Sequence, residues 1–282
     1  MIFDEQPLGV FAAGYPVAPA ALRHHLTGNP LLDMAALVEL TKALPAKSVE
    51  YNVGDLPVEQ DPDKTPMNGL SAEETVRRIQ DCDSWLVLKN IEDHPSYNAL
   101  LDNVLDEVSA LVAADHGPMY KREGFIFISS PGAVTPFHMD PEHNILLQIA
   151  GHKTFHLYPA NEPSLVSPEQ HESFHSEGGH RNLVHDKAYD AFRQSISLHP
   201  GDALHVPLKS PHWVQVGDEV SVSLSVTWRS RFSDAEARLH QVNGWLRQKG
   251  FNPPMRGEAL IRDSAKSLAH RLLSGVTRRL LG

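Results

Sequence analysis

Residues 135–153 read TPFHMDPEHNILLQIAGHK, and this stretch decides the fold. His138 and Asp140 stand two residues apart, just before the apolar run 144–150. Side chains at positions i and i+2 of a strand project from the same face, so an imidazole and a carboxylate at a strand end can reach one ion. The stretch therefore predicts a metal site beside a buried strand, in a domain built mainly from short strands.

A second imidazole is expected from residues 200–214, which read PGDALHVPLKSPHWV. The Pro-Gly-Asp turn begins one strand, Pro207 ends it, and His212 opens the next strand. Two imidazoles and one carboxylate form the facial triad that suits iron(II) and leaves three coordination positions open. We therefore predict that His138, Asp140 and His212 bind the metal and form the catalytic centre.

Lys153 stands 13 residues after Asp140, just past the Ala150-Gly151 turn. An ammonium group there can pair with the distal carboxylate of a dicarboxylic co-substrate, and the Thr135 hydroxyl can add a hydrogen bond. A solvated lysine in a turn is an equally good interpretation of the spacing alone.

Short segments separated by Pro and Gly dominate from Phe125 to Trp228, and they are typical of a β-sandwich or barrel. Val222, Leu224 and Val226 alternate with serines, which indicates a strand with two unlike faces. The predicted strands are 125–130, 144–150, 154–158, 195–198, 203–206, 212–216 and 220–228, with one more at 85–89.

Helices are expected on both sides of this strand-rich region. Their predicted ranges are 31–44, 75–81, 97–114, 235–248 and 257–281, and Ser71 with Glu74 forms a capping box before the second of them. We expect an N-terminal α/β scaffold at 1–120 that packs on the core, a catalytic core at 121–230, and basic C-terminal helices at 231–282. The fold class is mainly β with flanking helices (α+β).

Composition narrows the functional classes. Residues 1–228 hold 14 Lys and Arg against 31 Asp and Glu, whereas residues 229–282 hold 11 against 4. An acidic body argues against nucleic acid as the main partner. The single cysteine, Cys82, excludes a cysteine-based zinc cluster. The sequence holds no apolar stretch of membrane-spanning length and no signal-peptide pattern, so we expect a cytoplasmic protein without membrane partners.

The Thr-Pro-x-His-x-Asp motif, Asn144, the Gln-Ile-x-Gly-x-Lys motif and the Gly-Asp-x-Leu-x-x-Pro motif with its later His together resemble a known family. This family is the JmjC branch of the cupin-like, double-stranded β-helix (jelly-roll) oxygenases, which use Fe(II), 2-oxoglutarate and O2. Within this family the residues resemble those of an asparaginyl hydroxylase, and the resemblance covers residues 125–228.

The resemblance implies hydroxylation of a C–H bond with release of succinate and CO2. It implies that Lys153 and Thr135 bind the far carboxylate of 2-oxoglutarate and that Asn144 lies beside its near end. One position departs from the family, because Val226 or Ser225 stands where relatives place an Asn near the co-substrate.

The substrate follows less directly from the sequence. A protein or peptide side chain is the first expectation, and a small metabolite or free amino acid is the alternative. His175, His180 and Arg181, in a polar Gly-rich segment, are the candidate substrate contacts. His143, His152 and His156 are interpreted as bystanders, and Trp213 and Trp228 as core aromatics beside the metal pocket.

Two other functional classes stay open at this point, a metal-binding cupin that senses an effector without turnover and a zinc hydrolase. The resemblance also implies that the C-terminal helices pack on the core or form a homodimer.

Overall fold

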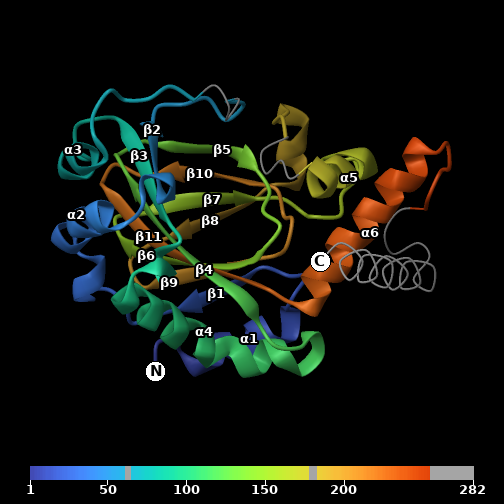
Figure 1. Cartoon of the computed structure of the whole chain (residues 1–282), viewed down its shortest axis with the longest axis horizontal. Helices are drawn as coiled ribbons and strands as arrows, with labels where there is room; N and C mark the ends of the chain where they lie inside the picture. Colours follow the sequence, from blue (N-terminus) through green and yellow to red (C-terminus); the bar gives the residue numbers. More distant parts are fainter. Residues whose placement is uncertain (61–64, 178–182, 255–282) are drawn as a thin grey trace, which may run out of the picture.

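The computed structural model describes residues 1–60, 65–177 and 183–254 of the chain. Its strands form two antiparallel sheets, with helices at their edges and on one outer face (Figure 1). The mainly β class with flanking helices, expected from the sequence, is therefore confirmed.

The seven-stranded sheet, here the major sheet, has the order β1-β9-β6-β11-β4-β3-β2. Its strands are β1 (Ala20–Arg23), β2 (Val49–Val53), β3 (Ser84–Lys89), β4 (Tyr120–Ser129), β6 (His143–Ala150), β9 (Asp202–Val206) and β11 (Ser221–Arg229). The four-stranded minor sheet has the order β5-β10-β7-β8. Its strands are β5 (Val134–His138), β7 (Lys153–Leu157), β8 (Gln194–Leu198) and β10 (His212–Val216).

The helices gather in three places (Figure 1). α1 (Glu5–Gly14) and α4 (Pro95–His116) lie along one side of the sheets, and α2 (Met34–Ala43) and α3 (Ala72–Arg77) lie at one end. α5 (Pro168–Glu177) and α6 (Arg231–Gln248) lie at the other end. The 3-10 helices are η1 (Pro30–Leu32), η2 (Ala46–Ser48), η4 (Ile91–Asp93) and η5 (Lys187–Phe192).

β11 separates two hydrophobic cores because its faces differ. Val222, Leu224, Val226 and Trp228 pack in the core under the helices, which includes Phe11 and Leu105. The serines of the alternate positions, Ser221, Ser223 and Ser225, are also buried, on the face that the major sheet turns toward the minor sheet. The smaller core between the sheets contains Leu146, Phe155, Leu157, Leu204, Val206 and Val214.

Most predicted elements are present, and the capping box of α3 is formed as expected. The sequence prediction missed β5, which contains Pro136. A proline removes a backbone donor and is therefore largely confined to edge strands, and β5 is indeed the edge of the minor sheet.

Strands from residues 1–120 belong to the same sheet as strands from 121–230, since β3 pairs with β4 and β1 pairs with β9. The predicted helix 257–281 lies outside the described residues. Homodimerisation through C-terminal helices and the cytoplasmic location stay predictions. In the part of the chain that the structure describes, every helix is too short or too polar to cross a bilayer.

Candidate metal centre

The three predicted ligands come together although their positions span 75 residues. His138 ends β5, Asp140 follows in the next turn, and His212 begins β10. The Nε2 atoms of His138 and His212 lie 3.8 Å and 3.7 Å from Asp140 Oδ2. One ligand atom from each residue lies within 4.8 Å of the other two, so the three can hold a single ion.

The backbone fixes which nitrogen of each ring faces the ion. His138 Nδ1 lies 2.7 Å from the carbonyl oxygen of Pro136, and His212 Nδ1 lies 2.9 Å from that of Ser210. A carbonyl oxygen only accepts, so each Nδ1 carries the proton and donates it. The Nε2 lone pairs of both rings therefore face Asp140, as coordination requires.

A bulge in β5 places Thr135 on the same face as this site. His212 pairs with His138 and Val214 pairs with Thr135, so three residue steps on β5 oppose two on β10. Residues three apart on a regular strand point to opposite faces, and the extra residue of a bulge corrects this. Thr135 thus lies opposite Val214, whose side chain is in the core between the sheets.

The His212 ring packs on an apolar wall. Phe155 stacks on it with the ring centroids 4.7 Å apart and an interplanar angle of 25°. Leu157 and Val206 continue the same core between the sheets. This packing holds the imidazole in place and keeps one side of the site dry.

Lys153 extends into the space between the sheets. Its side chain starts on β7 of the minor sheet, and its Nζ donates to Ser223 Oγ of β11 at 2.7 Å. The residue is 4% exposed, so the interpretation as a solvated turn lysine is wrong. Burial lowers the pKa of Lys153 to about 7. Among the described residues no carboxylate lies within ion-pair distance of Nζ, so a bound anion would stabilise the charged form of this buried amine.

The register of β11 settles the position that departs from the family. Ser225 Oγ donates to Asn144 Oδ1 at 2.7 Å, and both residues face the space between the sheets. Val226 lies on the opposite face, in the core under the helices. Ser225 rather than Val226 therefore lies next to Asn144, the predicted co-substrate residue.

The bystander histidines point away from the triad. His143 is fully buried on the helix-facing side of β6, and its Nε2 forms a hydrogen bond of 3.0 Å with Ser230 Oγ. Burial lowers the pKa of His143 to about 3. His156 lies on the outer face of β7 and stacks on Trp213, with centroids 3.8 Å apart. His152 lies at the beginning of β7, with Nε2 3.7 Å from Asp218.

Trp213 and Trp228 also face away from the metal site. Trp213 follows His212 on its strand and so points to the outer face, where its Nε1 donates to Tyr158. Trp228 is buried under the helices. Both are packing residues, as expected, but they are not beside the triad.

Of the candidate substrate contacts, His175 packs inside the α5–α6 pair, with its ring 5.1 Å from that of His240. His180 and Arg181 lie outside the described residues. Sequence reasoning missed Phe155 and Ser223, and it left Ser225 and Val226 as alternatives for one position. The alternation of serines along β11 was the signal for Ser223, but the sequence did not show that the serine face is buried.

Residues 36–234 match the sequence profile of a family described as "Cupin-like domain", which is more than half of the chain. The chain belongs to the family of cupin-like domains. The predicted resemblance to cupin-like JmjC proteins is therefore confirmed.

Two curated relatives share part of this cupin-like chain. HSPB1-associated protein 1 of Bos taurus is 27% identical over 160 residues, which are 53% of this chain and 33% of the relative. Lysine-specific demethylase 8 of Danio rerio is 35% identical over 105 residues, 34% of this chain and 25% of the relative. The cupin-like chain thus matches only a quarter to a third of the length of these proteins.

The fold as a whole resembles a solved structure from Escherichia coli, ycfD. The two share 16% identity at a TM-score of 0.53, over 96% of this chain and 68% of the other. A second structure of that protein, described as a ribosomal oxygenase in complex with cobalt and 2-oxoglutarate, gives a TM-score of 0.50 with the same identity. At this identity the likeness concerns the cupin-like fold alone.

Proposed function

We propose that this cupin-like chain is an oxygenase dependent on iron(II) and 2-oxoglutarate. It hydroxylates a C–H bond of a protein or peptide side chain and releases succinate and CO2. The observation that carries the proposal is the convergence of His138, Asp140 and His212 at a space that also contains the buried cation Lys153.

The donor set supports the choice of metal. Two neutral imidazoles and one carboxylate, all from one side, suit iron(II) and leave coordination positions for other ligands. An iron(II) ion held there would supply the redox chemistry that activates oxygen. The protein's part is to present the two Nε2 atoms and to keep the site apolar around Phe155.

The surroundings of Lys153 support the co-substrate. A buried ammonium is stable when it is paired with an anion, whereas among the described residues Lys153 Nζ donates to the neutral Ser223 hydroxyl. A dicarboxylate that binds the metal with one end can place its other carboxylate at Lys153 and Thr135. The E. coli protein of similar fold was solved with cobalt and 2-oxoglutarate, which agrees with this arrangement.

The names of similar proteins support a protein substrate. One relative is named a lysine-specific demethylase, and the E. coli protein is described as a ribosomal oxygenase. Both names refer to macromolecules, so a side chain of a protein or peptide is the first substrate class to test. A small metabolite is the alternative.

The experiment measures succinate from 2-oxoglutarate in the presence and absence of iron(II) and oxygen, with and without candidate peptides. We expect slow turnover without substrate, faster turnover with a substrate peptide, and a mass increase of one oxygen atom on that peptide. His138→Ala and Asp140→Ala should each abolish turnover, because each removes one of three ligands.

Three outcomes would contradict the proposal. Binding of the metal and 2-oxoglutarate without turnover under any condition would favour the sensor. Hydrolysis of a candidate peptide that needs zinc but no oxygen, with no succinate released, would favour a hydrolase. Full activity of Asp140→Ala would exclude the proposed metal site, because Asp140 would then not be a ligand.

A further inference from the structure

Lys209 lies in the turn between β9 and β10 and connects the two loops that carry the metal ligands. Its backbone N–H donates to the carbonyl oxygen of Asp140 at 3.0 Å. The next residue, Ser210, accepts from His212 Nδ1 at 2.9 Å. The backbone of two adjacent residues therefore holds two of the three predicted ligands.

The conformation of Lys209 is unusual for a residue with a side chain. Its φ is +62°, in the left-handed region that favours glycine. A glycine would give the same turn without the steric cost, so the lysine side chain is retained at an energetic disadvantage. An outlier of this kind beside a site is a reason to look for a role of the side chain.

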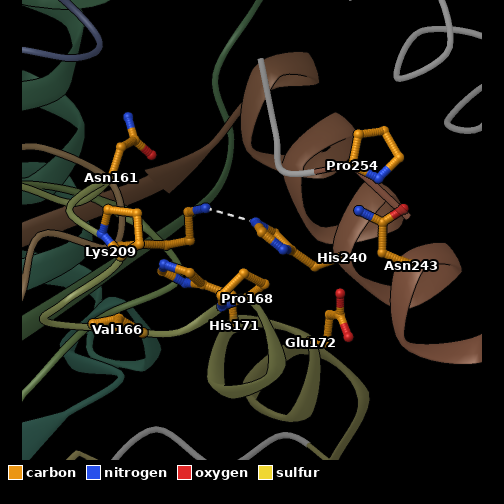
Figure 2. Close-up of a pocket in the computed structure, with 10 residues that line it drawn as sticks. Asn161, Val166, Pro168, His171, Glu172, Lys209, His240, Asn243 and Pro254 are labelled. Carbon is orange, nitrogen blue, oxygen red and sulfur yellow. Dashed lines mark hydrogen bonds between the residues drawn. The ribbon is translucent and has the colours of Figure 1, made fainter. Parts of the chain in front are cut away.

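The side chain of Lys209 runs from the turn to α6. It is 2% exposed, and its Nζ lies 2.9 Å from Glu236 Oε2 and 2.8 Å from His240 Nε2. Figure 2 shows this reach from Lys209 to His240 across a pocket between α5 and α6. Glu236 and His240 stand four positions apart and so share one face of the helix. One helix thus supplies both the carboxylate and the imidazole that contact the ammonium.

α6 is in turn fixed to its surroundings at several points. Arg247 of α6 pairs with Glu172 of α5 at 2.9 Å, and His240 stacks on His171 with centroids 5.0 Å apart. Ser230 caps the beginning of the helix. A firmly placed α6 can therefore fix the position of Lys209 and, through its N–H, that of Asp140.

We propose that Lys209 is a positioning residue for the metal site: its buried ammonium, anchored on Glu236 and His240, holds the turn that orients Asp140 and His212. The inference rests on the proposed function only in requiring that the triad binds an ion. The inference gives α6 a role in metal affinity, although the helix contains none of the three predicted ligands. A buried ion pair often contributes little to stability, which agrees with a role in geometry.

The test compares cobalt(II) binding to intact variant chains, measured by calorimetry and by visible absorption of the bound ion. Removing Lys209 alone would leave Glu236 buried without its cation, so the double variant Lys209→Met/Glu236→Gln removes both charges together. A second variant, Lys209→Gly/Glu236→Gln, keeps the left-handed turn and removes only the anchor. The matched control, Asp234→Asn/Arg238→Met, removes an ion pair within α6 and leaves the contacts of α6 with α5 and with Lys209 in place.

We expect both Lys209 variants to bind cobalt roughly 10- to 100-fold more weakly, the range typical of residues that orient metal ligands, with a changed absorption spectrum. The cobalt affinity of the control should stay within about threefold of wild type, since the lost pair joins two side chains of α6 itself. Thermal unfolding in the presence of a chelator shows whether each variant is folded.

Three results would overturn the inference or what it rests on. Wild-type cobalt affinity in either Lys209 variant excludes the anchor, and equal weakening in the control shows that affinity follows helix packing in general. If wild type binds cobalt and 2-oxoglutarate, such results reject this inference alone. A wild-type chain that binds no cobalt rejects the proposed function and this inference with it.

Discussion

At the scale of single residues, the sequence predicted the metal ligands but left the environment of Lys153 open. The His-x-Asp pair and the later His212 could be predicted from the sequence because an imidazole and a carboxylate two residues apart at a strand end suit one metal ion, which needs a second imidazole. The state of Lys153 was not readable. A lysine after a turn is usually solvated, and only the packing of two sheets over it excludes water.

The burial of Lys153 leads to a prediction about protons. Its pKa is about 7 in the folded chain and near 10.5 when exposed, so between these values the unfolded chain binds more protons. A carboxylate placed beside Nζ should restore the charged form. We expect 2-oxoglutarate binding to the metal-loaded protein at about pH 8.5 to take up close to one proton. Calorimetry in buffers of different ionisation enthalpy measures this uptake.

Lys153→Met is the control for that measurement. It should bind 2-oxoglutarate more weakly by about 2 kcal/mol or more and without the extra proton. It should also stabilise the chain without co-substrate, with a gain that shrinks as the pH rises from about 7 toward 10.5. Equal proton uptake in Lys153→Met and wild type would show that another group titrates.

At the scale of elements, the irregular edge strand β5 positions residues of the candidate metal site. The bulge in β5 turns Thr135 to the face of His138, and the edge position of β5 tolerates Pro136. Neither was predictable from the sequence, because a bulge depends on the register with β10. The two faces of β11 were predicted from its alternation, but which face met the metal site depended on the partner strands.

The beginning of α6 offers a test at this scale. Ser230 caps α6 and also contacts His143 Nε2 at 3.0 Å, and it is fully buried. Ser71 forms a similar but exposed capping box on α3. We expect Ser71→Ala to lower the free energy of unfolding by about 1 kcal/mol and Ser230→Ala by about 2 to 4 kcal/mol, because the second change also leaves a buried imidazole without its contact.

Urea unfolding of both variants measures this difference. A Ser230→Ala chain no less stable than Ser71→Ala would show that the contact with His143 contributes nothing.

At the scale of the whole molecule, the domain boundary expected at residues 120–121 separates strands that belong to one continuous sheet, the major sheet. β3 pairs with β4 over five registered positions, and β1 covers the edge of β9. The helices α1 and α4, both within residues 1–120, cover the face of the major sheet that includes Leu224 and Trp228. The division into scaffold and core therefore stays a prediction about folding units.

Excising residues 121–230 tests that division. We expect this fragment not to unfold cooperatively, because it exposes β4, β9 and the large apolar face of β11. Each large apolar side chain that loses its cover costs about 1.5–3 kcal/mol. Circular dichroism during urea titration compares the fragment with the full chain. A cooperative transition in the fragment would establish 121–230 as an independent domain.

The sequence by itself determined the class of fold, and it predicted the three candidate metal ligands and the candidate co-substrate residues. The fold class and the metal ligands follow from local periodicity and residue chemistry, whereas the roles of the co-substrate residues follow from the family resemblance. Only the tertiary structure decided that Lys153 is buried, that Ser225 rather than Val226 faces Asn144, and that Lys209 links the ligand loops to α6. Each of these depends on which distant strands and helices pack together, and the free energy of such packing is set by contacts that no local pattern records.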